Sequence, residues 1–213
     1  MFGRARKTLS EKDKDLLEQF SLGENHEEES WLKATFSFIL ETIKVLVLAA
    51  AIILPIRYFL IQPFYVKGAS MEPSFFDSEY LMINEISYRF TDPIRGDITV
   101  FRYPRDPRQF FIKRIVGMPG EVIEIKDGKV YISNPKTGKR AVLNESMYLA
   151  PGTVTTVNGG QESYTLGNDE YFLLGDNREH SLDSRNFGPV KESLIIGKVW
   201  FRGWPLDRIK VFN

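Results

Sequence analysis

The sequence predicts a mostly β protein, with an antiparallel β-sheet domain behind one N-terminal transmembrane helix. Two observations predict this class. An apolar run occupies residues 36–56, and from about residue 58 short runs rich in Val, Ile, Phe and Tyr alternate with glycine- and proline-containing turns. The chain has 213 residues, of which 43% are hydrophobic, so it can bury one good core.

The composition excludes several classes of function. Twenty-eight basic residues balance 28 acidic ones, which gives no reason to expect a nucleic-acid partner. The absence of cysteine removes disulfides, thiolate zinc sites and cysteine nucleophiles together. Only two histidines are present, so a metal site built from several histidines is not expected.

The N-terminal part divides into a charged tail, residues 1–35, and an anchor, residues 36–57. The tail is predicted to be mobile or weakly helical. Within the apolar run only Glu41 and Lys44 are charged, and their spacing allows them to pair on one helical face. The wholly uncharged part would also suit a buried core helix, but the apolar residues on both sides of it favour a membrane span.

The anchor is predicted to stay attached. Ala49–Ala51 lie inside the apolar run and a long charged tail precedes it, which is not the arrangement of a cleaved signal peptide. Lysine and arginine counts on its two sides barely differ, so charge alone does not set its orientation.

Residues 58–213 are predicted to form the β-rich domain. Asp127-Gly128 indicates a two-residue hairpin, and Pro119-Gly120 fits the centre of a type II turn. No helical pattern of comparable length separates the strands, which favours antiparallel pairing. The expected strands lie within residues 79–87, 96–104, 109–117, 121–133, 170–175 and 196–204.

Ser70, in the stretch KGASMEPS, is either a turn serine or a nucleophile that needs a base. Neither His26, in an acidic run, nor His180, far along the chain, is an obvious partner. The second glycine of G-x-S-x-G is missing, and Pro73 stands where S-x-x-K needs lysine. The sequence KTG at 136–138 is then predicted to be a hairpin loop rather than a catalytic motif.

Lys113 is a candidate for a catalytic base. On a strand it shares one face with the apolar residues Phe111 and Ile115. Such a lysine either snorkels at an edge or is buried. Burial lowers a lysine pKa by up to roughly 3 to 5 units, which would supply a neutral amine as a base.

Residues 175–188 form a polar loop after an apolar strand. Taken alone, the loop is explained by Asp–Arg hydrogen bonds, and its spacing does not fit a calcium site. It contains hydroxyl, carboxylate and guanidinium groups, from Ser181, Ser184, Asp176, Asp183, Arg178 and Arg185.

Four stretches, SMEPS, RGDITVF, KRIVGMPGE and GDNREHSLDSRNFG, follow an N-terminal anchor in this order. Together they resemble the motif boxes of type I signal peptidases, membrane-bound serine proteases with a serine/lysine dyad. The likeness covers about residues 60–205. It implies that Ser70 is the nucleophile and Lys113 its base, with no cofactor.

The resemblance also implies supporting roles. Ser181 would orient the Lys113 amine, Asp183 would form a salt bridge with Arg185, and Arg114 would pair with Asp176. The positions that match the pocket for the small residue before the cut are Val66, Gly68, Met71, Phe75, Phe111 and Ile112. Gly68 stands where many Gram-negative members have a serine that binds the oxyanion, so the second oxyanion donor stays open.

By this resemblance the chain removes signal peptides from secreted preproteins after an Ala-X-Ala-like sequence. It would be a single-pass protein of the plasma membrane, with its catalytic domain on the extracytoplasmic side and the lipid bilayer as a partner. The alternative is a membrane-anchored binding protein of the same fold without catalysis. A self-cleaving repressor with a related dyad would need a DNA-binding region, and here an anchor stands in its place.

Overall fold

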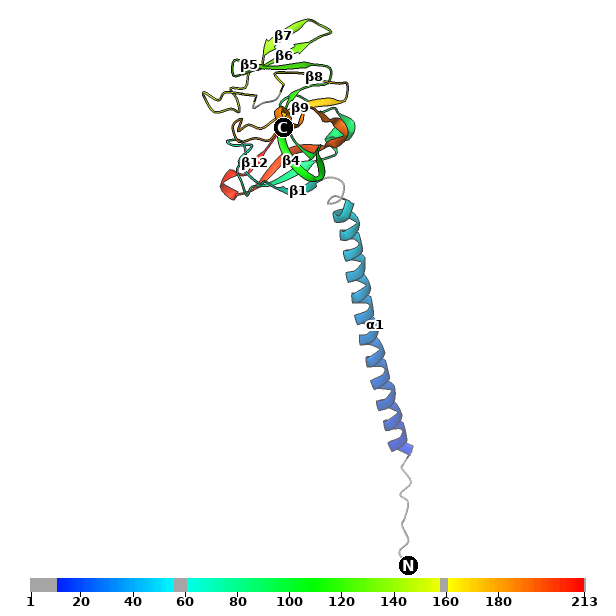
Figure 1. Ribbon diagram of the computed structural model, residues 1–213. Coiled ribbons are helices and arrows are strands. Elements are labelled where there is room, and N and C mark those ends of the chain that lie inside the picture. The colour runs from blue at the N-terminus through cyan, green and yellow to red at the C-terminus, as the bar shows by residue number, and fades with distance from the viewer. Residues whose placement is uncertain (1–10, 56–60, 158–160, 213) are drawn as a thin grey trace, which may run out of the picture. The chain divides into compact units, whose positions relative to one another are not determined.

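The computed structural model describes residues 11–55, 61–157 and 161–212 (Figure 1). By its internal contacts the chain divides into two units, Met1–Leu54 and Pro55–Asn213.

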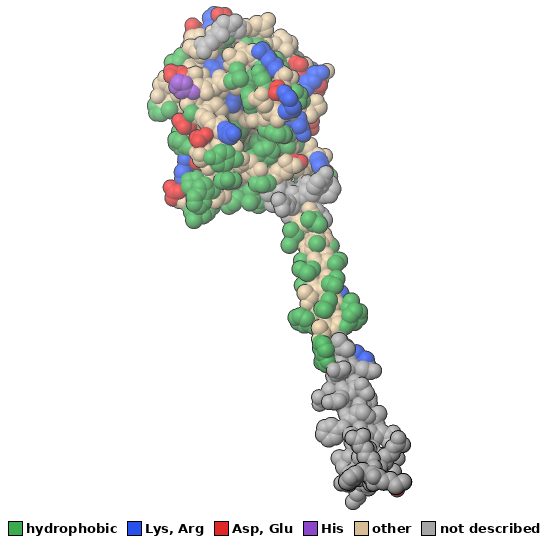
Figure 2. Space-filling view, turned by 60° about the horizontal axis from the view of Figure 1, so that its bottom comes forward, with side chains coloured by type: hydrophobic (Ala, Val, Ile, Leu, Met, Phe, Trp, Pro, Cys, Tyr) green, Lys and Arg blue, Asp and Glu red, His purple; other side chains and the backbone are tan. Residues whose placement is uncertain are grey.

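The described residues of the first unit, 11–54, all belong to one helix, α1 (Glu11–Pro55). It begins inside the segment for which the sequence predicted a mobile or weakly helical tail. Its part from Lys33 to Leu54 is long and apolar enough to cross a membrane, with a mean hydropathy of 2.3. Apolar side chains cover the visible face of this part (Figure 2), as expected for a surface in contact with lipid. The predicted end of the anchor, residue 57, lies outside the described residues.

The second unit contains an antiparallel sheet that holds most of the strands, and it confirms the predicted fold class. The strand order is β1-β2-β11-β3-β4-β9-β10, and β12 pairs with β11. The strands are β1 (Ile61–Tyr65), β2 (Tyr80–Asn84), β3 (Ile98–Tyr103), β4 (Asp106–Gly117), β9 (Glu170–Leu174), β10 (Val190–Lys191), β11 (Ile195–Trp204) and β12 (Lys210–Val211).

A smaller antiparallel sheet has the order β7-β6-β5-β8 (Figure 1). Its strands are β5 (Val122–Lys126), β6 (Lys129–Asn134), β7 (Lys139–Val142) and β8 (Ser163–Thr165). Asp127 and Gly128 join β5 to β6 with φ of 49° and 75°, the positive values that a tight hairpin needs. The predicted turn at Gly120 has φ of 76°, and Glu121 N donates to Met118 O at 3.2 Å. Both turn predictions are confirmed, and KTG lies in the β6–β7 loop.

Short helices complete this unit: α2 (Ser87–Phe90), α3 (Ser184–Phe187), and the 3₁₀ helices η2 (Glu192–Leu194) and η3 (Leu206–Arg208). Three apolar clusters fill the interior. One of them packs Val66, Met71, Phe75, Leu81 and Val100 with residues of β2 and β11, directly beneath the loop between β1 and β2. That loop carries Ser70, and its floor is therefore part of the core.

Candidate active site

The loop between β1 and β2 positions Ser70. Its two ends are joined by hydrogen bonds from Val66 N to Glu79 O, 2.9 Å, and from Ser78 N to Val66 O, 3.0 Å. Met71, next to Ser70, is fully buried and fixes the chain on that side. The Ser70 carbonyl accepts a hydrogen bond of 3.1 Å from Asn177 N, which ties the loop to residues 175–188.

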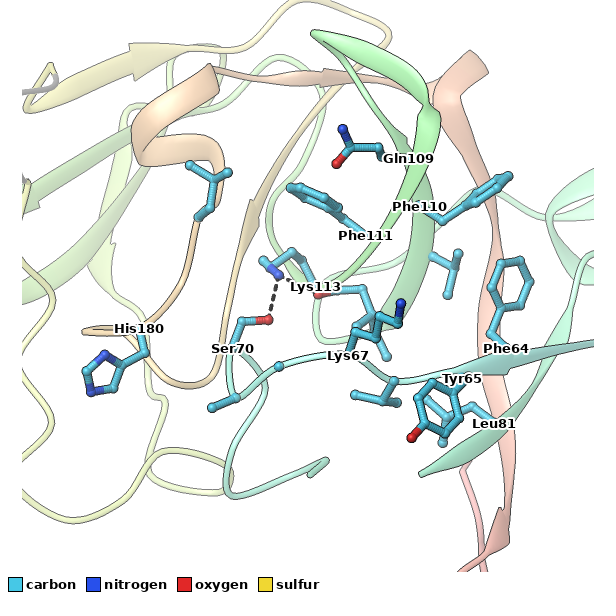
Figure 3. Close-up of a pocket in the computed structure, with 16 residues that line it drawn as sticks. Phe64, Tyr65, Lys67, Ser70, Leu81, Gln109, Phe110, Phe111, Lys113 and His180 are labelled. Carbon is cyan, nitrogen blue, oxygen red and sulfur yellow. Dashed lines mark hydrogen bonds between the residues drawn. The ribbon is translucent and has the colours of Figure 1, made fainter. Parts of the chain in front are cut away.

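Strand β4 brings Lys113 to Ser70. The strand lies between β3 and β9, and Lys113 is 3% exposed in this position. Its Nζ lies 2.8 Å from Ser70 Oγ and also donates to Ile112 O at 2.8 Å (Figure 3). The alternative in which this lysine snorkels at a sheet edge is therefore wrong, because β4 is an interior strand.

Burial changes the acid–base chemistry of Lys113. It lowers the pKa from 10.5 to about 8, because removal from water disfavours the ammonium form. The carboxylates of Asp183 and Asp176 act in the opposite direction and raise the pKa, while Arg185 lowers it. About a tenth of the amine is thus neutral near pH 7. A neutral amine at 2.8 Å can accept the hydroxyl proton.

Two buried ion pairs surround the dyad. Arg114 contacts Asp176 through Nε, 2.8 Å, and Nη2, 2.6 Å, and Ser74 Oγ also donates to this carboxylate at 2.5 Å. Arg185 contacts Asp183 through Nε and Nη2, both at 2.8 Å. The two-point geometry fixes both partners in orientation. These are the pairs that the resemblance implied.

Asp183 also organises the loop that faces Ser70. Its side chain caps α3 by accepting from Arg185 N, and it accepts a further hydrogen bond of 3.1 Å from Gly175 N. Gly175 itself has no room for a side chain, since a Cβ there would lie 2.5 Å from Ser70 O. With any residue other than glycine at position 175, the loop could not approach Ser70 O this closely.

Ser181 lies beside Gly175, but its hydroxyl does not hydrogen-bond to the Lys113 amine as the resemblance implied. Its Oγ would lie 2.1 Å from a Cβ on Gly175, so it stands over this glycine. The hydroxyl is buried and has no hydrogen-bond partner among the described residues. The Lys113 amine is held by Ser70 and Ile112 O instead.

A cavity of about 540 Å³ opens beside the dyad (Figure 3). Four of the predicted pocket residues line it: Val66, Gly68, Phe111 and Ile112. Met71 and Phe75 do not line it, because both are fully buried in the cluster beneath its floor. The sequence pattern placed them next to Ser70, but the turn directs both side chains into the core.

Several lining residues were not predicted. Phe64 and Tyr65 end β1. Their position directly before Val66, a predicted pocket residue, was the available sign that this strand borders the site. His180 and Leu182 flank Ser181 in the polar loop (Figure 3), and they could have been inferred from that neighbour. Leu81, Val100, Gln109 and Phe110 complete the wall from strands β2, β3 and β4, together with Lys67 and Ala69.

Comparisons with known proteins agree on one family. The model of the family described as signal peptidase, peptidase S26, matches residues 39–204. Signal peptidase I P of Bacillus subtilis subsp. natto is 34% identical over 175 residues, 82% of this chain and 94% of that protein. Signal peptidase IB of Staphylococcus aureus strain COL is 33% identical over 180 residues, 81% and 93% of the two chains.

Among solved structures, a crystal structure of a signal peptidase I from Enterococcus faecalis V583 aligns with a TM-score of 0.40 and 33% sequence identity. The alignment covers 51% of this chain and 97% of that one.

Proposed function

Because the chain belongs to the signal peptidase family S26, and is thus a serine endopeptidase of the signal peptidase I type, we propose that Ser70 and Lys113 form its catalytic dyad. Its substrates are secreted preproteins, from which it removes the N-terminal signal peptide after an Ala-X-Ala-like sequence. The observation that carries this proposal is the 2.8 Å distance from the buried Lys113 Nζ to Ser70 Oγ.

The first half of the reaction forms an acyl-enzyme. Neutral Lys113 accepts the hydroxyl proton as Ser70 Oγ attacks the scissile carbonyl carbon, which yields a tetrahedral oxyanion. The Lys113 ammonium then gives that proton to the amine of the mature protein, and the carbon–nitrogen bond breaks. The signal peptide remains as an ester on Ser70.

The second half uses water in place of the hydroxyl. Lys113, neutral again, accepts one proton from a water molecule that attacks the ester, and then returns it to Ser70 Oγ as the ester C–O bond breaks. The signal peptide leaves as a carboxylic acid, which loses the second proton of the water to solvent. Because Lys113 must be neutral at the start of each half, its lowered pKa serves both steps.

The buried pairs act as supports. Asp176 with Arg114 and Asp183 with Arg185 keep the 175–188 loop against Ser70, and their carboxylates prevent the pKa of Lys113 from falling further. A buried ion pair of this kind contributes more to the order of a site than to the stability of the fold.

The cavity accounts for the choice of substrate. Its apolar wall of Val66, Phe111 and Ile112 adjoins the dyad and suits the small residue before the scissile bond. The proposal keeps the three predicted domains: a cytoplasmic tail of residues 1–35, an anchor of residues 36–57, and a catalytic domain of residues 58–213. The catalytic domain would lie on the extracytoplasmic side of the plasma membrane, next to the signal peptides in the bilayer.

The test is cleavage of a purified preprotein by the full-length protein in liposomes, with the new N-terminus read by mass spectrometry. Ser70→Ala and Lys113→Ala should each remove nearly all turnover and leave circular dichroism unchanged. Exposed Ser163→Ala and Lys129→Ala serve as matched controls and should cleave normally. Turnover above a tenth of wild type in Lys113→Ala would contradict the assignment of the base. A wild-type protein that binds the preprotein but never cuts it would favour the binding-protein alternative.

A further inference from the structure

A series of hydrogen bonds runs along the loop between β1 and β2 that carries Ser70. It does not involve Ser70 or Lys113. Asp77 Oδ1 accepts from Gly68 N at 2.6 Å, and Asp77 Oδ2 accepts from Ser78 Oγ at 2.8 Å. Ser78 Oγ accepts in turn from the Tyr65 hydroxyl at 2.7 Å. Tyr65 and Gly68 both line the cavity, so these hydrogen bonds join the cavity wall to the loop.

Gly68 has a backbone conformation that needs such a tie. Its φ is +83°, in the region that favours glycine, and nothing lies within 4 Å of where its Cβ would be. No packing contact on the side of the missing Cβ therefore holds it in place. The backbone bonds at Val66 fix only the base of the loop, which leaves the Asp77 carboxylate as the group that fixes the residue two positions before Ser70.

The carboxylate is suited to this task at neutral pH. The Gly68 amide is the main cause that holds the pKa of Asp77 below its usual range, followed by the Ser78 hydroxyl. The side chain is exposed but ionised, and an ionised acceptor makes a stronger hydrogen bond to an amide than a neutral one.

The backbone amides of Gly68 and Ser70 differ in whether they already have a hydrogen-bond acceptor. The Gly68 N–H is directed to Asp77, so it is not available to an oxyanion. The Ser70 N–H has no acceptor among the described residues and is free to donate. Asp77 thus occupies the Gly68 amide and leaves the Ser70 amide without an acceptor among the described residues.

We propose that Asp77 is a positioning residue for the reaction: it holds Gly68 in the left-handed conformation that sets Ser70 Oγ against Lys113. This inference rests on the proposed function of Ser70, but the hydrogen bond itself is measurable without it.

The kinetic test compares Asp77→Ala, Asp77→Asn and the control Asp207→Ala, which removes an exposed carboxylate in η3. Misplacement of a reacting group by about 1 Å costs about 100-fold, so Asp77→Ala should lower kcat by about 10- to 100-fold, with a smaller change in KM. Its melting midpoint should stay near wild type, because Asp77 and Gly68 are both exposed.

Asp77→Asn keeps an oxygen that accepts from Gly68 N, so it should recover most of the lost kcat. Recovery by the amide separates a positioning role from a purely electrostatic one. An alanine variant with kcat within twofold of wild type, or an asparagine variant as slow as the alanine variant, would overturn the proposal.

The second test does not depend on activity. The chain has 16 glycines, so full-length protein labelled with ¹⁵N-glycine in detergent micelles gives few amide signals. In the Ser70→Ala background, Gly68 should show a downfield amide proton that exchanges slowly. Adding Asp77→Ala should move it upfield and speed its exchange, and an unmoved signal would overturn the proposal. Full turnover by Ser70→Ala alone would instead refute the proposed function.

Discussion

Removal of the Phe111 ring should move the acidic limb of the pH–rate profile to higher pH. The ring centroid lies 5.5 Å from Lys113 Nζ and stacks on Tyr103, with 4.6 Å between ring centroids, so it forms part of the apolar surroundings of the amine. In Phe111→Ala water would reach the ammonium form more easily. Since burial is the main cause of the lowered pKa, the pKa should rise from about 8 toward its ordinary value of 10.5.

The size of the effect follows from the fraction of neutral amine. With a pKa of about 8, a tenth of wild-type Lys113 is neutral one pH unit lower. Recovery of about one pKa unit, which corresponds to about 1.4 kcal/mol, would reduce that neutral fraction about tenfold more. One pH unit below the wild-type pKa, kcat/KM of the variant relative to its own plateau should then be about tenfold lower than the same ratio for wild type.

The assay is kcat/KM for a fluorogenic signal-peptide substrate across the pH range, with each variant normalised to its own alkaline plateau. Phe110→Ala is the matched control, because Phe110 lines the same cavity on the opposite face of β4. It should change the plateau but not the midpoint of the limb. A limb that stays in place in Phe111→Ala, or moves equally in both variants, would refute the assignment of the limb to Lys113.

Three further outcomes are expected. Between pH 8 and 10.5 the folded chain binds fewer protons at Lys113 than the unfolded chain, so stability should rise with pH there by about 3 kcal/mol. Urea unfolding should show this rise in wild type and lose it in Lys113→Met; equal slopes would contradict burial of the amine. A chain that begins near Tyr58 should fold and cut a soluble substrate, although exposed Trp200 and Trp204 should draw it to detergent, and failure to fold would show that α1 belongs to the core. Leucine in place of the alanine before the cut should abolish cleavage, because extra atoms forced into a packed wall cost about 1 to 3 kcal/mol and misplace the carbonyl, whereas leucine between the two small positions should matter little. Efficient cleavage after leucine, read by mass spectrometry, would contradict the pocket assignment.

The sequence by itself determined the features that depend on neighbours along the chain. Asp127 and Gly128 both have positive φ, which few other residue types tolerate. The pair between two strand-like runs therefore predicts a tight hairpin. The apolar run up to Leu54 is long enough to span a bilayer whatever follows it. Runs rich in Val, Ile, Phe and Tyr likewise located strands such as β4. The order of the motif boxes pointed to the family.

The tertiary structure decided which side chains are buried and which of them meet. The sequence of β4 alone leaves open whether Lys113 snorkels or is buried. Lys113 is a buried amine 2.8 Å from a hydroxyl because β4 lies between β3 and β9 and because Ser70 packs against it from 43 residues away. Met71 and Phe75 follow Ser70 in sequence, yet the turn sends both into the core. Ser181 stands over Gly175 instead of bonding to Lys113. Burial and hydrogen-bond distance depend on segments that pack from far along the chain, and local sequence does not contain that information.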